Sequence, residues 1–256
     1  MMIPYTGITG FMKASEVSVV LDSIPADAER MVMVGVLASS KTIRGIAIKR
    51  PNRYPIWERM GWIFQPHPRV LNLLHFSTDT HRPDVLYSEL RTAKELAGEH
   101  CHGFQLNMAW PGTDLLMRVL GEMRKSTIIV LQVGARAFEM IGHSPKKLAD
   151  KVESEYSGLI HYVLLDASGG KGLPLDAEML RPYLRALAAK QLPIGLGVAG
   201  GLSPVTLNLV QPLVDEFPHL SIDAEGKLRD KNDDLNVSAA ISYLARGNGL
   251  FKCGVV

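Results

Sequence analysis

The sequence is poor in cysteine and carries almost no net charge. Its 256 residues include two cysteines, Cys101 and Cys253, whose separation fits neither a metal site nor a redox motif. This argues against a disulfide scaffold and favours a reducing, cytoplasmic setting. The formal net charge is +2 with both signs mixed along the chain, so it gives no electrostatic basis for binding nucleic acid or an anionic membrane. We therefore expect a small molecule as the partner.

Long apolar runs and metal-binding patterns are also missing. No apolar stretch reaches the roughly 18 residues needed to cross a bilayer. The first residues, MMIPYTGITGFMK, lack the basic segment and apolar run of a secretory signal. The histidines show no i,i+4 pair or HxH spacing typical of a metal site. We expect a protein that uses no metal and no cofactor and does not bind membranes. A homodimer is possible.

What recurs instead is an apolar, β-branched run followed by an amphipathic segment. Near-continuous apolar runs are typical of parallel strands covered on both faces. The predicted strands are Met2–Tyr5, Met31–Leu37, Val70–Phe76, Gly103–Met108, Thr127–Val133, Tyr162–Leu165, Ile194–Val198 and Leu220–Asp223.

Helix signals lie between these strands. Ser144 before Pro145 and Ser203 before Pro204 each combine a good N-cap with a proline suited to the first helical position. Asp176 plays the cap role before AEMLRPYLRALAAK, and Pro212 predicts a kink or an early end in the helix after Ser203.

Eight such units in 256 residues suit a repeat of one strand and one helix. End-to-end alternation implies right-handed crossovers and a parallel sheet. We predict an α/β fold, a single (β/α)₈ TIM barrel over residues 1–256, although an open doubly wound sheet has the same alternation. The segment 41–68, rich in proline, arginine and aromatics, is expected to be a long irregular loop with a short helix on the catalytic rim.

Active sites of barrels form where strands end at the C-terminal face. The strongest candidate there is HYVLLDASGGKG, residues 161–172, in which an apolar strand delivers Asp166 and a loop with Gly169 and Gly170 follows. One interpretation makes Asp166 a general acid and the glycines a mobile cover over substrate. The other makes Asp166 a residue that caps a turn.

A second cluster, IGLGVAGGLSP, predicts a phosphate site. Gly200 and Gly201, with Leu202 beside them, let backbone N–H groups approach an anion, and the helix expected after Ser203 would point its positive end nearby. Barrels often bind phosphate with the loops after strands seven and eight. A plain tight turn is the alternative.

The third cluster, LSIDAEGKLRD, follows at the end of the eighth strand. Gly226 is expected to supply another backbone N–H to the same phosphate. Asp223 is expected either to face the ligand or to bond to a neighbouring loop.

These three clusters, in this order, resemble phosphoribosylanthranilate isomerase of tryptophan biosynthesis. They stand here as LLDASGGKG, VAGGLSP and IDAEGKLRD. The resemblance extends weakly to VGVLASSKTIRG (34–45), FQLN (104–107) and TGIT (6–9).

The resemblance implies an Amadori rearrangement in which the furanose ring opens and a proton then leaves C2 of the sugar. It gives Asp166 the role of general acid and Arg44 a contact to the substrate. It also implies that the substrate phosphate is bound by Gly200, Gly201 and Gly226. Binding of a phosphorylated sugar derivative is the function implied.

The sequence departs from the family at the position of the catalytic base. Thr6 stands where the family has a catalytic Cys, and a threonine hydroxyl cannot act as a base without an activator. Asn107 replaces the family's strand-four His, and Glu225 would repel a phosphate set against it. Candidate replacements at strand ends are His75, whose ordinary pKa suits base work near pH 7, and Glu225; Gln132, at the end of strand five, is a candidate substrate contact.

Three functions remain open at this point. The first is an isomerase with a different base. The second is a catalytically inactive barrel that serves as a phosphate-ligand sensor or an assembly subunit. The third is an unrelated lyase or aldolase that uses Lys171 as a Schiff-base nucleophile.

Overall fold

Parallel strands form along nearly all of the apolar runs and close into a barrel. The computed structural model describes residues 2–78, 80, 82–123, 126–168 and 173–252. Each strand pairs in parallel with the next one in sequence, and β8 pairs with β1, so the eight strands form a closed ring. The strands are β1 Tyr5–Thr9, β2 Met31–Ser39, β3 Val70–Ser77, β4 Gly103–Asn107, β5 Ile128–Gly134, β6 Tyr162–Asp166, β7 Gly195–Ala199 and β8 Ser221–Ala224.

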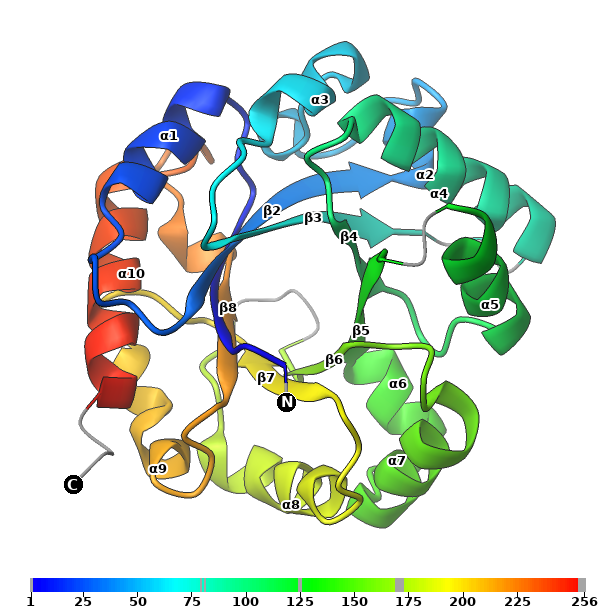
Figure 1. The fold of residues 1–256 in the computed structure, drawn as a ribbon, viewed down its shortest axis with the longest axis vertical. Helices are drawn as coiled ribbons and strands as arrows, with labels where there is room; N and C mark the ends of the chain where they lie inside the picture. The colour runs from blue at the N-terminus through cyan, green and yellow to red at the C-terminus, as the bar shows by residue number, and fades with distance from the viewer. Residues whose placement is uncertain (1, 79, 81, 124–125, 169–172, 253–256) are drawn as a thin grey trace.

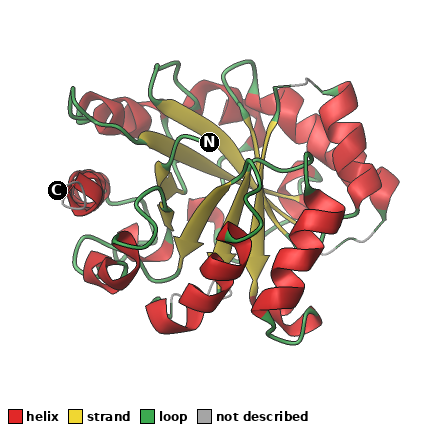
Figure 2. Ribbon diagram, turned by 60° about the horizontal axis from the view of Figure 1, so that its bottom comes forward, coloured by secondary structure: helices red, strands yellow, loops and turns green. Residues whose placement is uncertain are grey.

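Helices surround this ring on the outside (Figure 1), and the tilted view shows the strands enclosed by them (Figure 2). The α-helices are α1 Ala14–Asp22, α2 Ser40–Ile43, α3 Met60–Ile63, α4 Pro83–Ala97, α5 Thr113–Glu122, α6 Ala135–Met140, α7 Pro145–Lys151, α8 Ala177–Ala188, α9 Gln211–Val214 and α10 Val237–Lys252. The predicted (β/α)₈ barrel is confirmed, and the open doubly wound sheet is wrong. Within the described ranges, no helix has the length and apolar character needed to cross a membrane.

Seven strands lie within two residues of their predicted ends, but the first is misplaced. Met2–Tyr5 was expected, and β1 spans Tyr5–Thr9. The apolar run at Met2 leads into the strand without belonging to it, and β1 itself is rich in threonine and glycine. The shift decides which β1 side chains reach the site.

The seventh helix also differs from expectation. After Ser203 and Pro204 the chain makes turns, then a 3₁₀ turn at Leu207–Leu209, and only then the four-residue α9. Pro212 lies in the first turn of α9, where a missing N–H costs nothing, so the regular helix starts there and not at Ser203. By contrast, Ser144 and Asp176 cap α7 and α8 as expected, each accepting from the backbone N–H three residues on.

The lower part of the barrel interior is filled by large side chains. Tyr5 and Tyr162 pack edge to face with ring centroids 5.2 Å apart. Gly195 makes room for them, since a Cβ there would lie 2.2 Å from Cδ1 of Tyr162. The rest of this inner layer is Met33, Leu71, Leu73, Val130 and Leu164. Because these side chains plug the barrel below, the polar side chains above them face the mouth.

The segment 41–68 folds as an irregular connection between β2 and β3. It holds α3 and two 3₁₀ turns, Pro51–Arg53 and Trp57–Arg59. The Asn52 amide donates to the Asn232 carbonyl oxygen, and Arg53 binds both carboxylate oxygens of Asp233. The β2–β3 connection is therefore fastened to the loop after β8, across the end of β1.

Candidate functional site

Polar side chains gather in the upper half of the barrel interior, at the carboxyl ends of the strands. Strand alternation places every second residue inward. The strand residues that supply this polar layer are Thr9, His75, Gln105, Gln132, Asp166 and Asp223. All six are buried, and each comes from a different strand.

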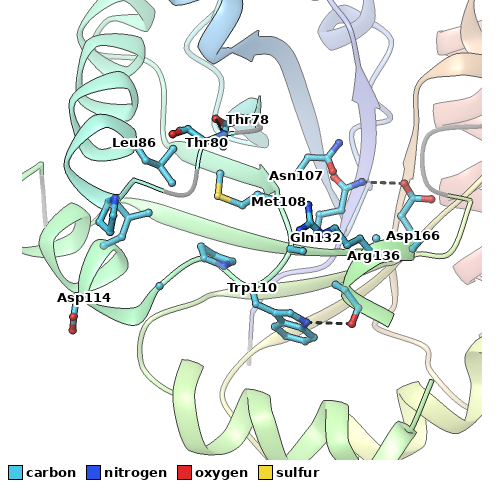
Figure 3. Close-up of a pocket in the computed structure, with 18 residues that line it drawn as sticks. Thr78, Thr80, Leu86, Asn107, Met108, Trp110, Asp114, Gln132, Arg136 and Asp166 are labelled. Atoms are coloured by element: carbon cyan, nitrogen blue, oxygen red, sulfur yellow. Dashed lines mark hydrogen bonds between the residues drawn. The ribbon is translucent and has the colours of Figure 1, made fainter. Parts of the chain in front are cut away.

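Asp166 is the last residue of β6 and accepts three hydrogen bonds. Gln132 Nε2 donates to Oδ2 at 2.9 Å (Figure 3). The backbone N–H and the hydroxyl of Ser168 donate to Oδ1 at 3.1 and 2.6 Å. Asp166 thus caps the turn after β6, as one of the two interpretations expected, and the role of general acid stays a prediction.

Asp223 faces the same mouth from β8. Its carboxylate accepts from Thr9 Oγ1 at 3.1 Å and from Gln105 Nε2 at 3.1 Å. Burial raises its pKa to about 7, the nearby negative charges of Glu225 and Asp166 add to the rise, and the bonds from Gln105 and Thr9 oppose it. Asp223 is therefore a carboxyl group that exchanges its proton near neutral pH.

Gln105 connects the two acids. Its amide nitrogen lies 3.1 Å from Gln132 Oε1 as well as 3.1 Å from Asp223 Oδ2. Since Gln132 in turn donates to Asp166, a chain of two amides joins one carboxylate to the other. The same nitrogen is 3.3 Å from His75 Nδ1 and so faces three partners with two hydrogens.

His75 lies within β3, on its inward side. Its Nε2 is 3.2 Å from Nδ2 of Asn107, the exposed last residue of β4. Burial lowers the His75 pKa, so the ring is neutral near pH 7 and has one nitrogen able to accept a proton. The structure thus brings His75, Asn107 and Gln132 together beside Asp166.

Thr6, the expected base position, is not part of this group. It is the second residue of β1 and points outward, where its hydroxyl accepts from Arg30 Nε at 3.3 Å. Its methyl faces α10, since a Cβ on Gly247 would lie 3.2 Å from Cγ2 of Thr6. The inward residues of β1 are Tyr5, Gly7 and Thr9, so it is Thr9 that reaches the mouth. The expected place of Thr6 is wrong because β1 starts three residues later than predicted.

The glycine turn after β7 lies beside Asp166. Gly200 and Gly201 have φ of +131° and +56°, conformations that favour glycine. A Cβ on Gly200 would lie 3.9 Å from Asp166 Oδ1, whereas one on Gly226 would meet nothing within 4 Å. Together with the buried Leu202, these glycines line a cavity of about 80 Å³ that also touches Asp166 and Asp223. The helix dipole expected at Ser203 is missing, because no regular helix starts there.

Glu225 and Arg53 close one side of this cavity. Arg53 Nη1 donates to Glu225 Oε1 at 2.8 Å while the other nitrogens of the guanidinium bind Asp233. Both Arg53 and Glu225 line the small cavity. The negative charge beside Gly226 is thus matched by a cation from the β2–β3 connection.

Arg44, for which the resemblance implies a contact to the substrate, follows directly after α2. Its Nε donates to the Ser40 carbonyl oxygen at 3.0 Å and lies 3.3 Å from Glu89. It lines a cavity of about 880 Å³ over β2 and β3, which shares His75, Asn107 and Glu225 with the small cavity.

Gly169, Gly170 and Lys171 lie outside the described residues. Among the residues that are described, no group of His, Cys, Asp and Glu is arranged to hold a metal ion.

A third cavity, of about 600 Å³, opens over β4 and β5 (Figure 3). It shares Asn107, Gln132 and Asp166 with the small cavity. The three cavities therefore form one continuous mouth, with the polar layer as its floor. Each of the two larger cavities has a volume typical of a small-molecule site.

Three residues of the site, Thr9, Arg53 and Gln105, were not predicted from the sequence. Gln105 precedes Asn107 by two positions and so shares its face of β4, a signal that alternation alone could have supplied. Thr9 was not predicted because the expected first strand ended at Tyr5, before this residue. Arg53 reaches the site from a connection that carries no regular pattern.

Comparison with known proteins supports the fold and little beyond it. No protein-family model matches the chain, and no curated protein matches its sequence. Among solved structures, phosphoribosyl anthranilate isomerase from Thermus thermophilus superposes with a TM-score of 0.63 at 16% identity, covering 97% of this chain and 100% of that one. A phosphoribosyl anthranilate isomerase in complex with reduced 1-(O-carboxyphenylamino)-1-deoxyribulose 5-phosphate gives a TM-score of 0.57 at 17% identity, covering 97% and 100%.

TrpF from Jonesia denitrificans gives a TM-score of 0.58 at 11% identity and covers 99% of this chain and 100% of that one. Identities this low show a shared fold. The chain has the barrel of the phosphoribosyl anthranilate isomerase structures over nearly its whole length.

Proposed function

We propose that this barrel binds a phosphorylated sugar derivative at its mouth and isomerises it by acid–base catalysis, with Asp166 and Asp223 as the two proton-transferring groups. The observation that carries the proposal is the pair itself. Two carboxyl groups face one cavity, each held by its own glutamine, and one of them has a pKa of about 7. Pairs of acids with different environments are a common means of dividing acid and base work.

The phosphate is assigned to the glycine turn. Gly200, Gly201 and Gly226 place no side chain between their backbone and the cavity that they line, and this cavity reaches both carboxyl groups. A ligand with its phosphate there has its sugar carbons over the polar layer. Binding by backbone N–H groups requires no helix dipole, so the loss of the expected helix weakens this site without removing it.

The proposed steps follow the Amadori chemistry that the resemblance implies. Asp166 donates a proton to the ring oxygen as the C1–O bond breaks, and the lone pair of the nitrogen on C1 forms the C1=N bond. Asp223, in its ionised form, then takes the proton from C2, and the C2–H electron pair forms the C1=C2 double bond of an enolamine. Asp223 then returns its proton to C1 while the C2 hydroxyl gives its proton to the ionised Asp166. The C2=O bond of the ketose forms, the C1=C2 bond becomes single, and both carboxyl groups regain their starting states.

Asp223 replaces Thr6 as the base in this proposal. Thr6 faces Arg30 and α10, whereas Asp223 lines the cavity and can take up a proton near pH 7. His75 is the second candidate base, supported by its neutral ring and by its place on the cavity wall.

The test follows the fluorescence of phosphoribosylanthranilate mixed with the native protein and with Asp166→Asn. Loss of the acid is expected to lower turnover by about 10²–10⁴-fold while binding persists. Asp215→Asn, at an exposed aspartate on the outside of the barrel, is the matched control and should behave as native. Tight binding with no turnover by the native protein would overturn the catalytic part and favour the ligand sensor.

A further inference from the structure

A cavity of about 300 Å³ lies at the opposite end of the barrel from the mouth. Pro4, which precedes β1, Arg30, which precedes β2, and His219, two residues before β8, all line it. The cavity therefore lies at the amino ends of these strands, below the layer of large side chains that fills the barrel. Asn248 and Phe251 of α10 form another part of its wall. Among the described residues, none lines both this cavity and the cavities of the mouth.

Arg30 brings a buried positive charge to this cavity. It is 6% exposed, and its hydrogen bonds go to neutral oxygens: Nε donates to Thr6 Oγ1 at 3.3 Å, and Nη2 donates to the carbonyl oxygens of Tyr5 and Leu220 at 3.0 and 2.5 Å. The Phe251 ring covers the guanidinium, with Cζ 3.9 Å from the ring centroid. Within the part of the chain that the structure describes, no carboxylate pairs with Arg30 and Nη1 has no acceptor. Because a buried charge without a counter-charge is costly, an anion in this cavity would be bound favourably.

Asn248 brings an unpaired amide to the same cavity. It is 5% exposed, and neither Oδ1 nor Nδ2 has a hydrogen-bond partner among the described residues. A buried side-chain amide ordinarily has partners for its donor and its acceptor, and it loses free energy where they are missing. Asn248 and Phe251 are three residues apart on α10 and so lie on one face of the helix. Since Phe251 covers Arg30, this is the face of α10 that packs against the guanidinium.

The two groups together define what the cavity can bind. Arg30 Nη1 and Asn248 Nδ2 are both donors, and two convergent N–H groups with a positive charge suit a carboxylate. Asn248 Oδ1 is an acceptor and requires a donor on the same ligand. The other charged residues of the wall, Glu29 and Lys252, are exposed, and Lys252 pairs with Asp27 at 2.5 Å. The apolar part of the wall consists of Met2, Ile3, Pro4, Pro218 and Phe251.

We propose that this cavity binds a small carboxylate whose neighbouring carbon carries a hydrogen-bond donor and a short apolar chain, the chemistry shared by 2-hydroxy acids and α-amino acids. The carboxylate accepts from Arg30 Nη1 and Asn248 Nδ2, and the hydroxyl or ammonium group donates to Asn248 Oδ1. The apolar chain packs against Ile3 and the two prolines of the wall. This site is separate from the mouth, so it does not depend on the proposed function.

Isothermal titration calorimetry compares 2-hydroxy-4-methylpentanoate with its amide, in which an uncharged group replaces the carboxylate. The native protein should bind the acid at least about tenfold more tightly than the amide. A third titration with L-leucine, which carries an ammonium in place of the hydroxyl, shows which of the two donors the site prefers. In ¹⁵N spectra the acid should shift the side-chain amide resonances of Asn248, assigned with Asn248→Leu. The indole N–H resonance of Trp110, at the mouth, should stay unchanged.

Asn248→Leu tests the amide directly. It should raise the melting temperature of the ligand-free protein, because an apolar side chain of similar size replaces a buried amide without partners. It should also weaken binding of the acid about tenfold, whereas Asn208→Leu, at an exposed asparagine, should leave the affinity unchanged.

Four results would overturn the proposal. The first is equal affinity of the native protein for the acid and the amide, or binding of neither. The second is a shift at Trp110 in place of Asn248. The third is native affinity of Asn248→Leu for the acid. The fourth is a lower melting temperature of ligand-free Asn248→Leu, which would mean that the amide already has a partner within the protein.

Discussion

The side-chain amide of Gln105 on β4 donates a hydrogen bond of 3.1 Å to the carboxylate of Asp223 on β8. These strands lie four places apart in a closed ring of eight, so the bond crosses the interior from one wall to the other. It holds Asp223 toward the centre of the mouth, where Gln132 and Asp166 continue the same chain of hydrogen bonds.

Gln105→Leu should raise the pKa of Asp223 above its native value of about 7. The hydrogen bond from Gln105 favours the ionised carboxylate, whereas burial favours the protonated form. The substitution removes the hydrogen bond and leaves the carboxyl group buried. The measurement is the pH dependence of the Asp223 carboxyl ¹³C shift. Gln65→Leu, at a surface amide that bonds to the Trp62 carbonyl, is the control. An unchanged or lowered pKa in Gln105→Leu would show that the bond does not set this equilibrium.

Asp223→Asn should stabilise the protein at pH 8 and have little effect at pH 4. The folded-state pKa of about 7 lies above the ordinary value of 3.8, so the folded state holds a proton that the unfolded state releases. Stability from the protonated group is complete below pH 3.8 and is lost as pH rises toward 7. Asparagine cannot ionise and avoids this loss, which is on the order of 2–4 kcal/mol.

Urea unfolding of Asp223→Asn and native protein at pH 4, 6 and 8 measures this effect. The difference in free energy of unfolding should grow between pH 4 and pH 7 and then level off. Asp215→Asn, at an exposed position, should give a difference that does not depend on pH. A constant difference for Asp223→Asn would mean that the carboxyl is already ionised at pH 4.

Thr6→Cys should leave the isomerase activity at its native level and give no reactive thiol. The side chain at this position is fully buried between β1 and α10, under Arg30, and does not reach the mouth. Labelling of the folded protein with dithiobis(nitrobenzoate) should stay at the native background for Thr6→Cys. Activity above the native level in Thr6→Cys would show that the side chain at this position reaches the mouth.

Glu225→Gln should tighten the binding of inorganic phosphate about tenfold. The substitution removes a negative charge beside Gly226 and frees Arg53 Nη1 to meet the anion. Isothermal titration calorimetry at low salt measures the affinity, with Glu58→Gln at an exposed site as the control. Unchanged affinity in Glu225→Gln would place the anion away from Gly226.

Much of the fold could be predicted because parallel strands covered on both faces are nearly continuous apolar runs. The same rule failed at β1. Its inward residues Gly7 and Thr9 are small or polar because Asp223 fills the space before them, and a Cβ on Gly7 would lie 2.7 Å from Asp223 Oδ1. The helix expected at Ser203 failed for a related reason, since a cap signal cannot tell how far the chain turns before a regular helix begins.

The site was predictable where a polar residue ends an apolar strand. Asp166, Asn107 and Asp223 follow that pattern, and the structure brings them to one mouth. Gln105 and the Arg53–Glu225 pair depend on contacts between segments about 120 and 170 residues apart, which only closure of the barrel creates.

The account is tested most directly by proton abstraction at C2. Phosphoribosylanthranilate deuterated at C2 is incubated with native protein and with Asp223→Asn, and release of the label to water is followed by NMR. The account predicts release by the native protein and at least about a 100-fold slower release by Asp223→Asn. Release at the native rate in Asp223→Asn, or bound substrate that keeps its label in the native protein, would contradict it.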